Sequence, residues 1–179
     1  MKKWTPLMLS RSGIIAALYV ALTFVCFSVA SGNIQFRISE MLTIMSLFYV
    51  EAIPALFIGC LLSNILTGCA IWDIILGSLV TTLSAFLTYL VGRFINNPFM
   101  KVFLGGLSPT VLNAFLLPLI WFFAYGTMEI FYWLNVLYLF ISEGTIIWIF
   151  GGVLYVVIAS LIKKNLSFML PISSLKQKH

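Results

Sequence analysis

The apolar stretch from Ser12 to Ala30 reads SGIIAALYVALTFVCFSVA and contains no charged residue. A helix that crosses a bilayer needs about 20 predominantly apolar residues, so this stretch is long enough to span a membrane. It follows the basic residues Lys2, Lys3 and Arg11, an order that also occurs in secretory signals. The stretch is longer than the apolar core of a signal peptide, about 7–15 residues, and further apolar stretches follow it. We therefore expect a retained first transmembrane helix.

The rest of the chain has the same apolar character. Hydrophobic residues make up 62% of its 179 residues and charged residues only 8%, whereas soluble domains are about 25% charged. This composition predicts an integral membrane protein with about six spans at most. The net charge of +5 is typical of basic residues at the inner side of a membrane, so we expect no nucleic-acid partner. The P-loop pattern is absent from the sequence, so energy for transport has to come from an ion gradient or another protein.

Apolar runs between charges, prolines and glycines predict the segments of the bundle. Six spanning segments are expected, at about residues 12–30, 39–49, 52–66, 73–92, 102–125 and 143–162. The apolar and aromatic stretch 127–141 predicts a short interfacial or re-entrant piece. We therefore expect an all-α integral membrane protein: one domain, residues 1–179, that forms a six-transmembrane-helix bundle with an additional short interfacial segment.

The charged residues divide between the two ends of these segments. If the N-terminus is cytoplasmic, nine of the ten basic residues lie on the inner side, as the positive-inside rule predicts. The C-terminus is then cytoplasmic as well, and Glu51 is the one acid on the inner side. The charges that gather at the outer side are Arg37, Glu40, Asp73, Glu129 and Glu143.

The outer charges are the first candidates for a binding site, because charged groups at membrane depth tend to face the bundle interior or a cavity. Arg37 and Glu40 are three residues apart and either pair with each other or contact a ligand. Gln35 offers an amide beside them. Glu143 follows Ser142, so it is either a first-turn acid behind a capping serine or a carboxylate that binds a ligand. The aromatic residues around it favour the ligand.

Three other side chains join the candidates. Asn64 and Asn113 are amides inside apolar helices, and each makes either an interhelical hydrogen bond or a ligand contact. Tryptophans prefer the membrane interface, but Trp133 is a candidate for stacking on a planar ligand. Asp73 and Glu129 are interpreted as interfacial acids.

Neither catalysis nor a cofactor is indicated. The one histidine is His179, and no nucleophile can be placed beside a base. The three cysteines lie in or beside apolar segments and predict neither a disulfide framework nor a metal site. We therefore expect a binding or transport protein that is not an enzyme. Two classes remain open: a binding subunit that depends on partners, and a self-sufficient carrier driven by protons or sodium.

Small residues form a stripe on the first segment. Gly13, Ala17 and Ala21 recur at every fourth position and therefore share one face of a helix. Small residues at this spacing allow helices to approach closely in a membrane. The stripe serves either packing within the bundle or the docking of a partner protein.

Three runs of sequence carry a resemblance to a known family. They are IQFRISE at residues 34–40, EAIPALFIGCLLSN at residues 51–64 and DIILGSL at residues 73–79. They resemble the QueT group of queuosine-precursor transporters, closely from about Gly13 to Leu90 and more loosely around Asn113 and Glu143. The resemblance implies a six-helix S-component, the substrate-binding subunit of an energy-coupling factor (ECF) transporter, in the plasma membrane of a bacterium.

The resemblance also implies a ligand and partners. The ligand would be 7-aminomethyl-7-deazaguanine or a related 7-deazapurine, with queuine or another vitamin-like heterocycle as alternatives. Glu40 and Glu143 would accept its N–H groups, Arg37 would orient Glu40 or donate to the ring carbonyl, and Asn64 or Asn113 would complete the rim. A transmembrane scaffold subunit would contact the stripe of small residues, and two ATPase subunits would drive delivery. Residues 31–38 resemble the substrate gate of such proteins.

Overall fold

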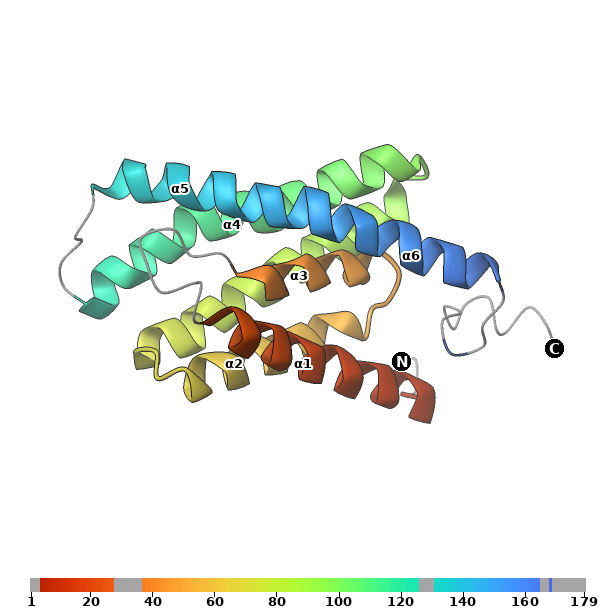
Figure 1. Ribbon diagram of the computed structural model, residues 1–179, viewed down its shortest axis with the longest axis horizontal. Helices are drawn as coiled ribbons and strands as arrows, with labels where there is room; N and C mark the ends of the chain where they lie inside the picture. Colours follow the sequence, from red (N-terminus) through yellow and green to blue (C-terminus); the bar gives the residue numbers. More distant parts are fainter. Residues whose placement is uncertain (1–3, 28–36, 126–130, 165–167, 169–179) are drawn as a thin grey trace.

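The computed structural model describes residues 4–27, 37–125, 131–164 and 168, and the secondary structure of these residues is entirely helical (Figure 1). The elements follow the chain in the order α1 (Pro6–Phe27), the 3₁₀ helix η1 (Ile38–Leu47), α2 (Ala52–Leu66), the π-helical η2 (Asp73–Gly77), α3 (Ser78–Phe94), α4 (Pro98–Tyr125), α5 (Tyr132–Thr145), the π-helical η3 (Ile146–Phe150) and α6 (Gly151–Lys163). Each of the six predicted segments contains a helix.

Four helical segments are long and apolar enough to cross a membrane. They are Pro6–Cys26, Asp73–Phe94, Pro98–Phe123 and Tyr132–Lys163, whereas the apolar helices Ile38–Leu47 and Ala52–Leu66 are shorter. The chain is therefore a multi-pass membrane protein with an all-helical fold. The start of α1 and the end of α6 lie at the same end of the bundle (Figure 1).

The predicted interfacial piece at residues 127–141 is wrong over residues 132–141. These residues form the first part of one continuous helical segment, Tyr132–Lys163. No proline interrupts this segment. A polar side chain such as that of Glu143 does not end the helix, because the backbone hydrogen bonds form within the helix whatever the side chain is. The last predicted segment therefore begins about ten residues too late. Residues 127–130 lie outside the described part of the chain.

The start of α4 differs from the prediction for a local reason. We expected the fifth segment at residue 102 because Lys101 interrupts the apolar run, but the helix begins at Pro98. The Oδ1 atom of Asn97 accepts hydrogen bonds from the backbone N–H groups of Phe99, at 3.0 Å, and Met100, at 3.4 Å. Proline at the first helical position behind an asparagine cap is a common helix start.

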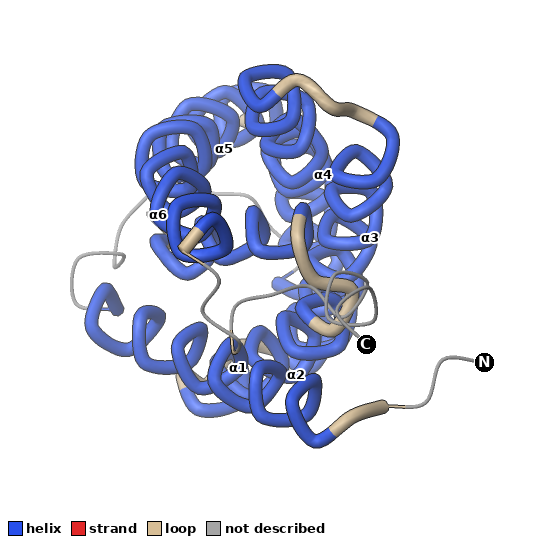
Figure 2. Tube along the Cα trace, turned by 90° about the vertical axis from the view of Figure 1, so that its right-hand side faces the viewer, coloured by secondary structure: helices blue, strands red, loops and turns tan. Residues whose placement is uncertain are grey.

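The short helix η1 lies at the centre of the bundle. It packs against α1, α2, α3, α4, α6 and η3. Figure 2 shows α1 and α2 on one side of the molecule and α3, α4, α5 and α6 around the rest. Gly92 allows α3 to approach η1, because a Cβ atom at this position would lie 2.4 Å from the carbonyl oxygen of Leu47.

Apolar side chains pack the bundle in more than one cluster. One cluster joins α1, η1, α2, α3 and α6 around residues such as Ile15, Leu56 and Ile158. Another joins α3, α4 and α5 around Val80 and Leu117. The same helices also bury polar side chains, which make up the candidate site.

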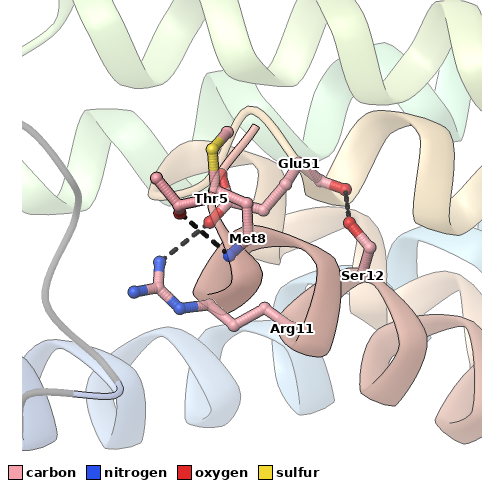
Figure 3. Close-up of polar contacts among 5 residues, drawn as sticks. All are labelled: Thr5, Met8, Arg11, Ser12 and Glu51. Atoms are coloured by element: carbon pink, nitrogen blue, oxygen red, sulfur yellow. Dashed lines mark hydrogen bonds and ion pairs between the residues drawn. The ribbon is translucent and has the colours of Figure 1, made fainter. Parts of the chain in front are cut away.

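A buried ion pair fixes the first helix to the turn before α2 (Figure 3). The Nη1 atom of Arg11 lies 2.8 Å from the Oε1 atom of Glu51, and the two side chains are 3% and 4% exposed. The Ser12 hydroxyl donates to the backbone carbonyl of Glu51 at 3.0 Å. The Arg11 guanidinium also lies 4.9 Å from the centre of the Tyr49 ring. The sequence placed Arg11 and Glu51 on the same side of the membrane, and the structure brings them into contact.

Candidate functional site

The candidate site consists of polar side chains that several helices bury together. Its buried members are at most 6% exposed: Glu40 on η1, Asn64 on α2, Asp73 on η2, Thr81 on α3, Asn113 on α4 and Glu143 on α5. Burying a polar group is costly unless it has a hydrogen-bond partner. The partners of each side chain therefore separate groups that stabilise the fold from groups available to a ligand.

Glu40 is fully buried and held by three hydroxyl groups. Its carboxylate accepts hydrogen bonds from Tyr19 at 2.5 Å, Thr43 at 3.3 Å and Thr81 at 3.4 Å. Gly59 permits this arrangement, because a Cβ atom there would lie 2.8 Å from the Cβ atom of Tyr19. Tyr19 is not among the candidates selected from the sequence, although a tyrosine in the middle of an apolar span is a signal for such a buried polar contact.

Arg37 is partly buried and does not pair directly with Glu40. Its Nη2 atom donates to Oδ1 of Asn64 at 3.0 Å. The amide nitrogen of Asn64 donates in turn to the backbone carbonyl of Asp73 at 3.3 Å. Asn64 therefore connects the guanidinium to the start of η2. Arg37 still interacts electrostatically with Glu40 and Asp73.

Glu143 and Asn113 are buried without hydrogen-bond partners of good geometry. No partner of Glu143 or Asn113 meets hydrogen-bond geometry at either carboxylate oxygen or either side-chain amide atom, although the two side chains lie close enough for a weaker hydrogen bond to each other. Glu143 also interacts electrostatically with Glu40 and Arg37. Such groups are rare in folded proteins, and a bound ligand is one way to satisfy them.

The capping interpretation of Glu143 is wrong. Glu143 lies well inside the helical segment Tyr132–Lys163 and not at its start. The Ser142 hydroxyl donates to the backbone carbonyl of Leu139 at 3.2 Å, so it does not cap a helix N-terminus. The position of Glu143 thus excludes the capping role, and the ligand contact stays a prediction.

Asn113 lies on a helix that contains Pro109 and Pro118. Pro109 has no N–H group for the carbonyl of Gly105, four residues earlier. That carbonyl instead accepts the hydroxyl of Thr88 at 2.8 Å. The backbone group released by the proline is therefore satisfied within the protein, whereas the side chain of Asn113 is not.

Asp73 belongs to the site, although the sequence analysis interpreted it as an interfacial acid. Its side chain is 6% exposed, and its Oδ1 atom has no hydrogen-bond partner. It opens the π-helical stretch η2, and π-helical turns frequently occur at functional sites. Sequence periodicity does not show such a turn, and the sequence placed Asp73 only among the outer charges.

The remaining predicted residues lie elsewhere. Trp133 is 61% exposed, and its ring packs edge-on against Tyr132 at 5.3 Å between centroids, so the structure does not bring it to the buried cluster. Gly13, Ala17 and Ala21 are exposed on α1. Gln35 and Glu129 lie outside the described residues, as do residues 31–36 of the predicted gate.

The arrangement is suited to binding a polar ligand. Glu143 offers two hydrogen-bond acceptors, Asn113 offers an acceptor and a donor, and Arg37 supplies a positive charge. No group of three His, Cys, Asp or Glu side chains within the described ranges could hold a metal ion.

The comparisons with known proteins agree with the resemblance seen in the sequence. The chain is 41% identical over 83 residues to the queuosine precursor transporter QueT of Lactococcus lactis subsp. cremoris (strain MG1363). This match covers 45% of the chain and 48% of the relative, so it spans about half of that protein. No solved structure matches the chain. The family model described as QueT transporter matches residues 9–160, most of the sequence, and the chain therefore belongs to the QueT transporter family.

Proposed function

We propose that this protein is the membrane subunit that binds a queuosine precursor for uptake, with 7-aminomethyl-7-deazaguanine or a related 7-deazapurine as its ligand. Membership of a transporter family supports transport as the function and agrees with the expectation that the chain is not an enzyme. The observation that carries the ligand class is the unpaired, fully buried carboxylate of Glu143 beside the unpaired amide of Asn113.

The chemistry of a deazaguanine matches these two side chains. Its ring N–H and exocyclic amino group lie next to each other, and a carboxylate can accept both at once. The neighbouring ring carbonyl needs a donor, which the Asn113 amide or the Arg37 guanidinium can supply. Glu143 and Asn113 are therefore the proposed recognition pair.

Glu40 has a different proposed task. Its carboxylate already accepts from Tyr19, Thr43 and Thr81. It is therefore better placed to fix the wall of the site than to bind the ligand directly. Its charge also interacts with Arg37 and so helps to hold the guanidinium at the site.

We further propose the architecture and partners of an ECF S-component. The two shorter helices η1 and α2 would complete a bundle of six transmembrane helices, with both termini cytoplasmic. The exposed residues Gly13, Ala17 and Ala21 would contact the transmembrane scaffold subunit, and two ATPase subunits would supply energy. Their position supports docking, because small exposed residues leave room for a second helix to approach.

The test is a binding titration of the purified chain with 7-aminomethyl-7-deazaguanine, its 7-cyano precursor, queuine and guanine. We expect 7-aminomethyl-7-deazaguanine to bind most tightly. Glu143→Gln should weaken this binding at least about 100-fold, because the new amide N–H group would face a donor of the ligand. Ser142→Ala is the matched control, since Ser142 is buried next to Glu143 but bonds its own helix.

Each result bears on a different part of the proposal. Unchanged affinity in Glu143→Gln would remove Glu143 from the site. Tighter binding of queuine than of the aminomethyl compound would replace the proposed ligand. Absence of binding to all four compounds would contradict the proposed substrate class.

A further inference from the structure

The buried polar cluster holds more negative than positive charge. Glu40, Asp73 and Glu143 are each at least nine-tenths buried. Arg37 is the guanidinium that interacts electrostatically with all three. Arg11 pairs with Glu51. Arg93, Lys163 and Lys164 are exposed on other parts of the described bundle, and Lys101 lies partly exposed in the first turn of α4. Buried charges normally require compensation by an opposite charge or by hydrogen bonds.

Only part of this negative charge is satisfied within the protein. Glu40 has its hydroxyl donors, but both oxygens of Glu143 and the Oδ1 atom of Asp73 have no partner. Two carboxylates therefore remain for a ligand. A ligand that carries a positive charge would compensate the buried Asp73 carboxylate better than a neutral one.

Glu143 and Asp73 offer different hydrogen-bond acceptors to a ligand. Glu143 has two free oxygens beside an unpaired amide, which suits the flat edge of a heterocycle with adjacent N–H groups. Asp73 has one orphaned oxygen, Oδ1, so it suits a single strong donor such as an ammonium group.

Asp73 belongs to η2, which packs against α4, the helix that carries Asn113. Gly77, one turn after Asp73, carries no side chain, and a Cβ atom there would lie 3.2 Å from Oδ1 of Asp73 and 4.0 Å from Cδ2 of Leu117. Leu117 follows Asn113 by four residues and so shares its face of α4. Gly77 therefore lies close to both the Asp73 oxygen and α4, the helix that carries Asn113, and a side chain at this position would crowd the Asp73 oxygen.

We propose that Asp73 is a further substrate-binding residue, whose carboxylate accepts a hydrogen bond from an ammonium group of the ligand while Glu143 and Asn113 bind the heterocycle. This assignment rests on the proposed function, in which the ligand is a 7-deazapurine. Asp73 then makes the site selective for a cationic aminomethyl substituent over a neutral substituent of the same size.

Compensation of the helix dipole does not account for Asp73. An acid in the first turn of a helix is stabilising because it lies near the positive end of the dipole. That effect does not require burial, since a water-exposed carboxylate provides it as well. The burial of Asp73 and the unpaired Oδ1 atom require a donor that the described part of the protein does not supply.

The test compares 7-aminomethyl-7-deazaguanine with 7-hydroxymethyl-7-deazaguanine, in which a neutral hydroxyl replaces the ammonium group. The wild-type chain should bind the hydroxymethyl compound about 100-fold more weakly, as expected for loss of one partner of a buried charge pair. Asp73→Asn should bind the aminomethyl compound about 100-fold more weakly than the wild type does. Its affinity for the hydroxymethyl compound should stay within about threefold of the wild-type affinity. Glu143→Gln should weaken the binding of both. Thermal unfolding shows whether each variant is folded, and Asp73→Ser replaces Asp73→Asn if the latter does not fold.

The outcomes separate this inference from the proposed function. Equal wild-type affinity for the two compounds would overturn the charge selectivity. If Asp73→Asn lost affinity equally for both compounds, or lost none, the assignment of the ammonium group to Asp73 would be overturned. Absence of binding of either compound to the wild-type chain would overturn the proposed function on which the inference rests.

Discussion

Buried polar residues of the same chemical type have different tasks in this protein, and their hydrogen-bond partners tell them apart. Glu51 is paired with Arg11, and Glu40 accepts three hydroxyl groups. Glu143, also a fully buried glutamate, has neither kind of partner. The first two acids are therefore held within the bundle, whereas the third is the acid that we propose to bind the ligand.

The Arg11–Glu51 pair leads to a prediction about stability. Glu51→Leu should lower the free energy of unfolding by about 3–5 kcal/mol, because it removes one partner of a buried ion pair. Replacing both residues, in Arg11→Met with Glu51→Leu, should recover part of this loss, since apolar side chains of similar size tolerate burial. Thermal unfolding of the purified variants in detergent measures both effects. A single variant as stable as the wild type would contradict the structural role of the pair.

At the scale of elements, glycines decide how closely the helices approach one another. Gly92 lies where α3 meets the end of η1, and a Cβ atom there would lie 2.4 Å from the carbonyl oxygen and 2.7 Å from the Cα atom of Leu47. Both atoms belong to the backbone, which cannot turn aside as a flexible side chain can. The position of η1 at the centre of the bundle therefore depends on a residue without a side chain.

We predict that Gly92→Ala lowers the free energy of unfolding by about 1–3 kcal/mol through this clash. The control is Gly13→Ala, because a Cβ atom at Gly13 meets nothing within 4 Å and both glycines lie in helices. Alanine is the better helix former by about 1 kcal/mol, so the control should be neutral or slightly more stable. Thermal unfolding of the two variants side by side gives the comparison. A Gly92→Ala variant as stable as Gly13→Ala would show that α3 and η1 can move apart without cost.

The boundaries of the elements were predictable to different degrees. The predicted segment 52–66 coincides with α2, and residues 39–49 overlap η1 within two residues at its C-terminal end. The start of the Tyr132–Lys163 segment was missed, because aromatic residues near its beginning are as typical of an interface as of a helix. Hydropathy detects apolar helices well, but it does not distinguish a helix that continues from one that begins.

At the scale of the whole molecule, α1 presents two faces with separate proposed tasks. Tyr19 points inward and donates to Glu40, whereas Gly13, Ala17 and Ala21 are exposed. One helix thus contacts the wall of the candidate site with one face and leaves its small residues available to a partner on the other. Partner docking and ligand binding should be separable by mutation.

We predict that Ala17→Leu combined with Ala21→Leu leaves ligand affinity unchanged but stops ATP-dependent uptake. The larger side chains would prevent close approach of the scaffold subunit. The measurement is uptake of labelled ligand by liposomes that contain the chain with the scaffold and ATPase subunits. Val153→Leu with Val156→Leu on α6 is the control, because both valines are exposed and lie away from the stripe.

Two results would contradict this prediction. Normal uptake by the α1 variant would refute the docking role of the stripe. Uptake by liposomes that contain the wild-type chain alone would identify a self-sufficient carrier instead of a partner-dependent subunit.

The sequence by itself determined the membrane character, the helical segments and the side chains most worth testing, because hydropathy and charge are properties of short stretches of chain. It selected Asn113 and Glu143 as candidates, and it predicted that Arg11 and Glu51 lie on the same side of the membrane. Only the tertiary structure decided which buried groups have partners. Glu40 receives donors from Tyr19, 21 residues before it, and Thr81, 41 residues after it. Contacts between distant helices depend on how the helices pack, and the periodicity within each helix does not encode them.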